Sequence, residues 1–208
     1  TVEIAREKLL YRQEFSRGVA VTALEEIGTA PNRRGTTVTF TPDTEIFGEN
    51  AKFRASTLYH MARSKAYLFA GVEIRWRCDP ALLASNGNIP ADAGLRFPGG
   101  LADALNDATR DKRLMISTPF AEFAELDGQK FEWAITWLAP SEDGFFQSYC
   151  NTVPTPLGGT HETGFRQAIL RGLRNYGDMA GQKKSAELTS EDIFAETAGM
   201  LSVFLQDP

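Results

Sequence analysis

The sequence predicts a mixed α+β fold, and three patterns support this prediction. Residues 131–137 alternate apolar and polar side chains with the period of two that is typical of a half-buried strand. Residues 160–179 place apolar side chains on one arc of a helix, and the β-branched run at 36–39 indicates a further strand. Apolar residues make up 42% of the 208 residues and charged residues 24%, which allows a packed core.

The first part of the chain is expected to contain short strands followed by one helix. Residues 1–47 read as strands, the last of which is closed by Thr41-Pro42-Asp43. A helix is predicted over residues 49–66, because apolar side chains recur there at helical spacing. Residues 72–77 then alternate as a half-buried strand.

The middle of the chain is expected to begin with a flexible excursion. Residues 79–94 are rich in Ala, Asn, Asp, Gly and Pro, which are typical of irregular backbone. The Gly99-Gly100 pair lacks the spacing of a phosphate-binding loop, so we interpret it as a strand-to-helix turn. It leads into a short predicted helix over residues 101–108.

Two strand patterns separated by a turn come next. The strand at 131–137, the polar turn at 141–144 and a second strand pattern at 145–153 together predict an antiparallel hairpin. The amphipathic helix that follows is expected to pack on this hairpin.

The end of the chain is expected to form a helix and a last strand. Thr189 is the predicted N-cap of the helix, with Asp192 at the third helical position, and Gly199 is expected to end it. Residues 200–206 are predicted to form the strand.

The segment 147–179 combines more distinct signals than any other. Pro154 and Pro156 end its strand, because proline cannot donate a hydrogen bond to a neighbouring strand. Gly158 and Gly159 then allow a sharp turn into the helix.

Three residues mark the expected start of this helix. Thr160 is the predicted N-cap, and Glu162 lies in the first turn, where the helix dipole favours a carboxylate. A structural role at the helix start is more plausible for His161 than a catalytic one.

The formal net charge of −5 argues against nucleic-acid binding over the whole surface, so any such contact must be local. The window 161–184 is net positive within this acidic chain. Its helical arginines, Arg166, Arg171 and Arg174, have two readings: solvated surface side chains, or positive charge presented to a phosphate backbone.

A resemblance to a known family rests on residues 149–173, YCNTVPTPLGGTHETGFRQAILRGL. They resemble the transducer segment of the type II topoisomerase ATPase subunits, with its pattern N-x-x-P-T-x-x-GGTH-x-x-G-hydrophobic-R. YRQEFSRG, RRGTTVTFTPDTEIF, LTSEDI and LSVFLQDP agree with the same family. Within it, the topoisomerase IV B subunits are the nearer resemblance and the DNA gyrase B subunits the second.

The resemblance implies a division into two domains. Residues 1–47 would be the C-terminal edge of a GHKL ATP-binding domain. Residues 48–208 would be a transducer domain of the ribosomal protein S5 domain 2-like α+β fold, a mostly β sheet with helices on one face. The chain would stop before the Gln-Thr-Lys loop of the family.

The resemblance also implies roles for some residues at the nucleotide. Gly35 and Thr36 match the Gly-Thr strand that lies at the adenine of ATP, although Thr36 is also an ordinary strand former. Arg6 falls, by spacing alone, where gyrase-like proteins carry an arginine at the mouth of the nucleotide pocket.

Further roles concern DNA and the hinge. Arg166 matches the arginine of the family pattern and, with Arg171 and Arg174, is expected to line the cavity through which DNA passes. The residues 158–161, Gly158, Gly159, Thr160 and His161, are expected to form a structural turn that acts as a hinge or contacts the ATP domain.

No catalytic residues are expected within this chain. It has no metal-ligand spacing, no P-loop and no recognisable set of nucleophile, base and acid. The resemblance places the catalytic glutamate, the Mg-holding asparagine and the ATP lid upstream, and the lysine for the γ-phosphate downstream, so both ends are expected to be cut. ATP and Mg²⁺ are expected in the parent protein, and neither is expected on this fragment, which we expect to be inactive alone.

The implied parent protein couples ATP binding to gate closure and DNA strand passage in chromosome segregation, by decatenation and relaxation. Its expected partners are duplex DNA, the DNA-cleaving A subunit and a second B subunit. Open alternatives are a supercoiling gyrase B subunit, a MutL-like GHKL binding module, and a stand-alone RNA- or DNA-binding domain.

The expected location is the bacterial cytoplasm, at the nucleoid and without a membrane partner. The sequence contains no signal peptide and no apolar run long enough to cross a bilayer. Cys78 and Cys150 are far apart and suggest reduced thiols.

Overall fold

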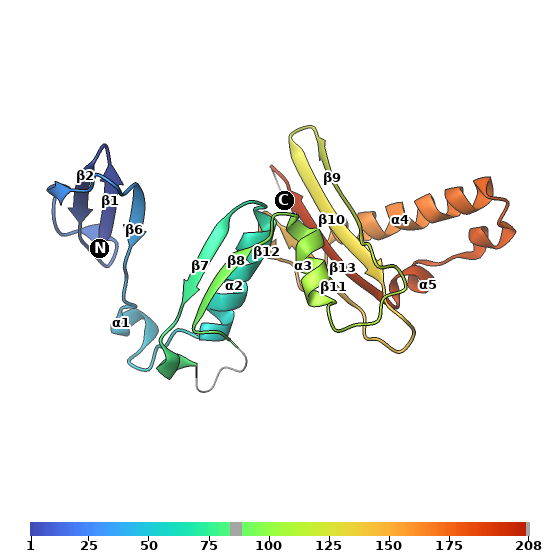
Figure 1. The fold of residues 1–208 in the computed structure, drawn as a ribbon, viewed down its shortest axis with the longest axis horizontal. Coiled ribbons are helices and arrows are strands. Elements are labelled where there is room, and N and C mark those ends of the chain that lie inside the picture. Colours follow the sequence, from blue (N-terminus) through green and yellow to red (C-terminus); the bar gives the residue numbers. More distant parts are fainter. Residues whose placement is uncertain (84–88, 207–208) are drawn as a thin grey trace. The chain divides into compact units, whose positions relative to one another are not determined.

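The computed structural model describes residues 1–83 and 89–206, which belong to two compact units, Thr1–Phe53 and Arg54–Pro208 (Figure 1). The domain boundary predicted between Phe47 and Gly48 falls inside the first unit, shortly before this division. Strands and helices occur in both units, as the sequence predicts for an α+β chain. No helix of the described ranges is long and apolar enough to cross a membrane.

An antiparallel sheet in the strand order β5-β2-β1-β6 forms the first unit. Its strands are β1 (Val2–Arg6), β2 (Leu9–Gln13), β5 (Glu25–Thr29) and β6 (Gly35–Val38). Strands β3 (Phe15–Ser16) and β4 (Val19–Ala20) pair with each other, and helix α1 (Thr44–Phe47) follows the sheet. The short strands expected near the start of the chain are therefore confirmed, and only α1 was not foreseen.

A five-stranded sheet in the order β12-β11-β13-β10-β9 forms the centre of the second unit. Its strands are β9 (Phe120–Leu126), β10 (Gln129–Trp137), β11 (Phe145–Cys150), β12 (Val153–Pro154) and β13 (Thr197–Phe204). Strand β13 pairs antiparallel with β10 and parallel with β11. The antiparallel hairpin predicted from β10 and β11 is therefore wrong, because β13 lies between them.

The burial of β13 explains its central place. Seven of its eight residues are buried, so the strand requires cover on both faces and a neighbour along each edge. The chain between β11 and β13 contains helix α4 (Thr160–Met179), and a parallel strand pair needs such a crossover. Strands β10 and β11 are close in sequence, which favoured a hairpin. The apolar strand β13 from the end of the chain lies between them instead.

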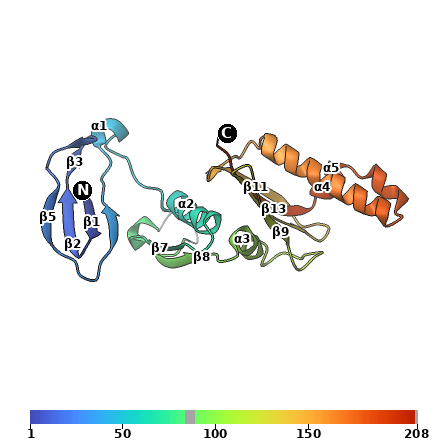
Figure 2. The ribbon, with the colours of Figure 1, turned by 90° about the horizontal axis from the view of Figure 1, so that it is seen from above.

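Helices cover both faces of this sheet, as Figures 1 and 2 show. Helix α3 (Gly100–Ala108) packs on β10 and β13, where the Leu101 N–H donates to the Glu132 carboxylate. Helix α4 packs on the opposite face through Phe165, whose ring centroid lies 6.1 Å from that of Trp133. Glu132 and Trp133 are adjacent in β10 and therefore point to opposite faces. The expectation of helices on one face alone is wrong.

Helix α2 (Ala55–Leu68) packs against α3 and against the pair β7 (Glu73–Arg77) and β8 (Asp92–Arg96). The helix predicted over residues 49–66 therefore begins too early. Ala55 is the first residue of this region to be buried in the second unit, whereas the ring of Phe53 packs edge-on against Phe40 of the first unit. The helical spacing of apolar residues in the sequence runs through Phe53 and Ala55, although these two residues pack in different units.

Strand β7 is confirmed, with Ile74 and Trp76 half-buried. The flexible excursion predicted over residues 79–94 is wrong at both ends. Asp79 caps a short 3-10 helix, Pro80–Leu82, by accepting from the Ala81 N–H, and β8 begins at Asp92 because it pairs with β7. Residues 84–88 of the predicted excursion lie outside the described residues.

Strand β9 was not predicted, although its turn carries a sequence signal. It joins β10 through Asp127 and Gly128, whose φ angles of 52° and 75° are both positive. Asp-Gly is a preferred dipeptide for such two-residue hairpin turns. The predicted strand-to-helix turn at Gly99-Gly100 is confirmed between β8 and α3.

The last helix, α5 (Ser190–Phe194), follows a 3-10 helix, η2 (Lys183–Glu187). Thr189 and Asp192 form the expected capping box. Gly199 does not end the helix but lies within β13, where a Cβ atom would meet the ring of Phe146. The last strand accordingly begins at Thr197 rather than at residue 200.

The contact between α3 and the sheet includes a half-buried carboxylate. Glu132 accepts the Leu101 N–H at 2.8 Å, at the N-terminal end of α3. Burial raises the pKa of Glu132 above its ordinary value of 4.5, and the bond from Leu101 opposes this rise. Gly100 has φ 58° and must remain small, because a Cβ atom there would clash with the Glu132 carboxylate.

We expect Glu132→Gln to change the pH dependence of stability. A carboxyl group with a raised pKa in the folded state binds its proton more tightly there, so its contribution to stability falls as pH rises above 4.5. Glutamine keeps the acceptor oxygen without this loss. The stability of the variant relative to the natural protein should therefore be greater at pH 7 than at pH 4, measured by urea unfolding.

The matched control is Glu122→Gln, which changes an exposed glutamate on β9. Its stability difference should not depend on pH in the same way. An equal difference for Glu132→Gln at pH 4 and pH 7 would contradict the role assigned to burial.

Candidate functional site

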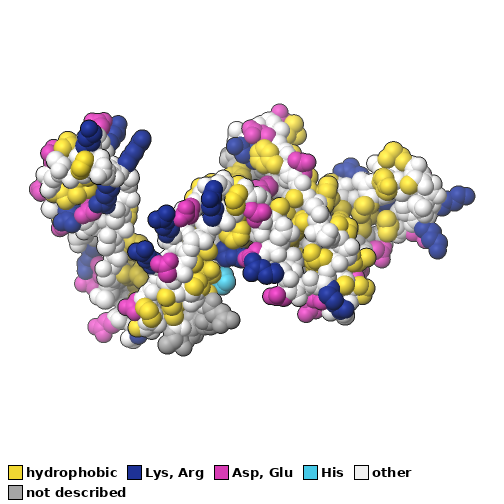
Figure 3. All heavy atoms as spheres, viewed as in Figure 1, with side chains coloured by type: hydrophobic (Ala, Val, Ile, Leu, Met, Phe, Trp, Pro, Cys, Tyr) yellow, Lys and Arg dark blue, Asp and Glu magenta, His cyan; other side chains and the backbone are white. Residues whose placement is uncertain are grey.

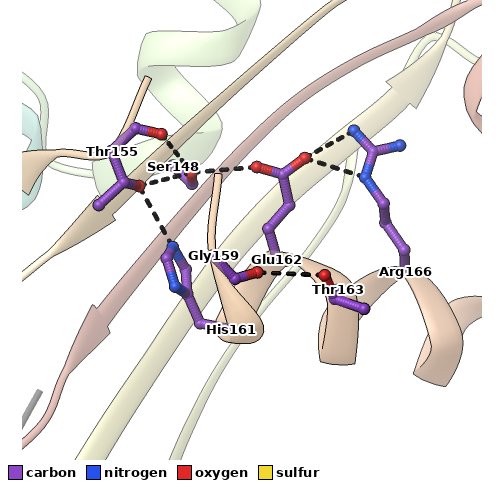
Figure 4. Close-up of polar contacts among 7 residues, drawn as sticks. All are labelled: Ser148, Thr155, Gly159, His161, Glu162, Thr163 and Arg166. Atoms are coloured by element: carbon purple, nitrogen blue, oxygen red, sulfur yellow. Dashed lines mark hydrogen bonds and ion pairs between the residues drawn. The ribbon is translucent and has the colours of Figure 1, made fainter. Parts of the chain in front are cut away.

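The Gly158-Gly159 turn leads from the sheet into α4, and polar side chains gather around it (Figure 4). Gly158 has φ 72°, a left-handed conformation that glycine adopts without strain. Gly159 is the N-cap residue and has an extended backbone. The prediction that Thr160 caps the helix is wrong, because Thr160 is already its first helical residue and no side chain caps this end.

Ser148 of β11 lies at the centre of a hydrogen-bond network, which we call the junction network. Its hydroxyl oxygen lies 2.7 Å from that of Thr155 and donates to Oε2 of Glu162 at 3.2 Å. The Thr155 hydroxyl oxygen lies 3.2 Å from Nε2 of His161. The network therefore ties strand β11, the following loop and the first turn of α4 together.

The junction network does not have the arrangement of a catalytic site. His161 contacts Thr155 and not Ser148, and Ser148 is only 5% exposed, so no base activates an accessible nucleophile. Within the described ranges, no group of three or more His, Cys, Asp or Glu side chains could hold a metal ion. The arrangement is suited to fixing a helix on a sheet rather than to chemistry.

Arg166 extends the junction network along α4. Its Nε and Nη2 donate to Oε1 of Glu162 at 3.0 and 2.8 Å, and both side chains are largely withdrawn from solvent. The guanidinium also lies over the rings of Phe146 and Phe194, 4.8 and 4.5 Å from their centroids. Two of its five N–H donors are thus used inside the protein, where its guanidinium also contacts two aromatic rings.

The other two arginines of the predicted set differ from each other. Arg174 donates from Nε to the Leu188 carbonyl oxygen at 3.0 Å, so it fixes the segment that returns from η2. Arg171 is exposed to solvent. Figure 3 shows further basic side chains at the outer end of α4, whereas basic and acidic side chains alternate over the rest of the visible face.

The three residues predicted at the nucleotide lie on neighbouring strands of the first unit. Ala5 pairs with Gly35, and Ile4 pairs with Thr36. Because Arg6 is two residues after Ile4, Arg6 and Thr36 lie on the same face of the sheet. Both are exposed, and Arg6 makes a 3.5 Å surface ion pair with Glu7.

Several residues around the start of α4 carry no sequence signal that links them to it. Ser148, Thr155 and the two phenylalanines that flank Arg166 become partners only through the fold. Glu162 and Arg166 could have been paired in advance, since residues four apart share one face of a helix.

Comparison with known proteins gives a consistent result over the whole chain. The family model described as DNA gyrase B matches residues 100–208. The B subunit of DNA topoisomerase 4 from Bartonella bacilliformis is 51% identical over 209 residues, and that from Caulobacter vibrioides is 44% identical over 213 residues. Each match covers 100% of this chain and 30% of the relative, so the chain spans less than a third of these proteins.

Solved structures with a similar fold point to the same family of proteins. The 43K ATPase domain of Thermus thermophilus gyrase B, solved in complex with an aminocoumarin, has a TM-score of 0.80 and 30% identity, covering 100% of this chain and 55% of that one. The topoisomerase IV ATP-binding domain of Francisella tularensis, solved with a small-molecule inhibitor, has a TM-score of 0.73 over 100% of this chain and 54% of that one. At 24% identity, the second likeness concerns the fold alone.

Proposed function

Since the chain belongs to the DNA gyrase B family, we propose that it is part of the B subunit of an ATP-dependent type II topoisomerase of the topoisomerase IV kind. The observation that carries the proposal is the 51% identity over the whole chain to a B subunit of DNA topoisomerase 4. A gyrase B subunit is the second candidate, favoured by the likeness to the Thermus thermophilus ATPase domain. Family membership speaks against a MutL-like module and against a stand-alone nucleic-acid-binding domain.

In this proposal, residues 1–47 are the last strands of a GHKL ATP-binding domain and residues 48–208 a transducer domain of the S5 domain 2-like fold. Arg6, Gly35 and Thr36 contribute to the nucleotide site, supported by their places on neighbouring strands. ATP and Mg²⁺ act in the longer protein. The fragment alone holds neither and is inactive, and it works by transmitting the nucleotide state.

The junction network supports this mechanical role. Its hydrogen bonds fix the first turn of α4 to β11, and the contact of Phe165 with Trp133 fixes the same helix to β10. A helix held in this way moves with the sheet as one body. A displacement that begins at the ATP domain is thereby passed on towards the DNA-cleaving A subunit.

DNA contact is proposed for the arginine face of α4. Arg171 is the leading member, because it is exposed, whereas Arg166 and Arg174 use part of their donors inside the protein. Such contacts attract phosphates without reading bases. The partners in this proposal are duplex DNA, the A subunit and a second B subunit, in the bacterial cytoplasm at the nucleoid.

The experiment that tests the proposal is light scattering of the full-length B subunit. We expect a shift from monomer to dimer when a non-hydrolysable ATP analogue is added, because the family function requires a gate closed by nucleotide. A folded protein that shows no nucleotide-dependent change of mass would contradict the topoisomerase proposal.

A second arm separates DNA contact from gate closure. Arg171→Ala should leave the nucleotide-dependent dimer unchanged but slow ATP-dependent decatenation by the complete enzyme. Arg77→Ala is the matched control, since Arg77 is also exposed but lies on β7. Equal activities of the two variants would contradict the role of Arg171. If the complete enzyme supercoiled DNA in preference to decatenating it, the gyrase candidate would be favoured instead.

A further inference from the structure

A cleft lies between helix α2 and strands β11 and β12, away from the junction network. Its volume is about 490 Å³, which is within the range of small-molecule sites. The residues that line it come from two places in the sequence, helix α2, with Lys65 and Tyr67 among them, and the sheet side, with Gln147, Tyr149 and Thr152 among them.

The lining of this cleft is cationic, although the chain as a whole is acidic. It contains an arginine, a lysine and a histidine, and no Asp or Glu is among the described residues that line it. Arg63 is engaged elsewhere, since it forms an ion pair with Asp107 of α3 and lies over the ring of Phe97. Lys65 is therefore the cation that can serve a ligand.

Lys65 is held in place by neutral groups. Its ammonium donates to the carbonyl oxygen and the hydroxyl oxygen of Thr152, at 2.6 and 2.7 Å. A lysine has three N–H donors, so one remains for a ligand. Among residues 1–83 and 89–206, no carboxylate forms an ion pair with Lys65, and its positive charge is thus not neutralised by the described protein.

Two buried tyrosines provide a further donor. The hydroxyl oxygens of Tyr67 and Tyr149 lie 2.5 Å apart, so one hydroxyl donates to the other. The hydroxyl proton that is not shared between the two tyrosines has only a weak partner within the described residues. The Tyr149 hydroxyl oxygen lies 3.4 Å from Oε1 of Gln147, which is long for a hydrogen bond. Burial raises the pKa of Tyr67, which keeps its hydroxyl protonated.

We propose that this cleft binds a small organic phosphate, with Lys65 and the tyrosine pair as its donors to the phosphate oxygens. Donors that approach from separate elements suit a tetrahedral anion with several acceptor oxygens. The cleft is larger than one phosphate requires, and Met61 and Pro154 provide apolar contact for an organic group. None of the proposed ATP residues lines the cleft, and the inference does not depend on the proposed function.

The test is an NMR titration of the 208-residue chain with inorganic phosphate at constant ionic strength. We expect saturable shifts of the amide signals of Lys65, Gln147 and Thr152. Lys65→Gln should weaken binding about tenfold, the effect of losing one charge-assisted hydrogen bond. Lys130→Gln is the matched control, because Lys130 is a half-exposed lysine on β10 outside the cleft. Phenyl phosphate should bind more tightly than inorganic phosphate.

Three results would overturn the inference. One is the absence of saturable shifts at the cleft. Another is equal weakening in Lys65→Gln and Lys130→Gln, which would indicate general charge attraction. The third is that phenyl phosphate binds no more tightly than inorganic phosphate, which would show that the cleft does not contact an organic group. If Lys65→Gln does not fold, Lys65→Met provides the same comparison, because it also removes the ammonium group and keeps an unbranched side chain.

Discussion

Replacing Glu162 by alanine is expected to lower the free energy of unfolding by about 2–3 kcal/mol, less than the loss of a fully buried ion pair because some solvent reaches the site. The Arg166 guanidinium loses two hydrogen bonds of 2.8 and 3.0 Å while its side chain is 30% exposed. The buried Ser148 hydroxyl loses an acceptor as well. Urea unfolding, with the midpoint and slope both reported, measures the change.

Two further variants make this prediction specific. Glu122→Ala removes an exposed glutamate from β9 and should change stability by less than about 0.5 kcal/mol. The double variant with Arg166→Ala should lose less than the sum of the two single variants, because the two residues share one interaction. Equal effects of Glu162→Ala and Glu122→Ala would show that the junction network does not stabilise the fold.

Phe165→Ala is expected to cost about 3 kcal/mol, the usual range for removing a packed phenylalanine. The ring contacts Trp133 of β10, Phe146 of β11 and Phe194 of α5, at centroid distances of 6.1, 5.9 and 6.4 Å. It thus joins α4 to two strands and one helix. Hydrogen exchange should also become faster in the first turns of α4, because their contact with the sheet is weakened.

The control for this prediction is Leu157→Ala. Leu157 lies in the loop before α4 and is fully exposed, so its truncation removes no packing and should leave both stability and exchange unchanged. If Phe165→Ala behaved like Leu157→Ala, the start of α4 would be held to the sheet by the hydrogen bonds of the junction network and not by this ring.

The two variants together address what holds α4. Near its start, Glu162 and Phe165 fix the helix to the sheet, whereas Tyr176 and Met179 at its far end are 68% and 81% exposed. There, the helix is supported by η2, which approaches so closely at Gly177 that a Cβ atom would clash with Ser185. Loss of the first anchor should therefore loosen the first turns of α4 more than its far end.

Local patterns in the sequence predicted much of this structure. The alternation in β7 and β10, the capping box at Thr189 and the turn before α3 depend on residues close together in the chain. The GGTH segment is likewise a local pattern, and it indicated the turn into α4. The Asp-Gly signal for the β9–β10 hairpin is also local.

The sequence by itself indicated the type of several elements, among them β7, β10, α3 and α4, but not α1, β8 or β9, and its GGTH pattern indicated which family the chain resembles. The tertiary structure alone decided that β13 separates β10 from β11, and that helices cover both faces of the sheet. It also decided that Arg166 faces Phe146 and Phe194 instead of solvent alone. These features follow from burying apolar strands and rings that are far apart in the chain, and such burial leaves no local pattern.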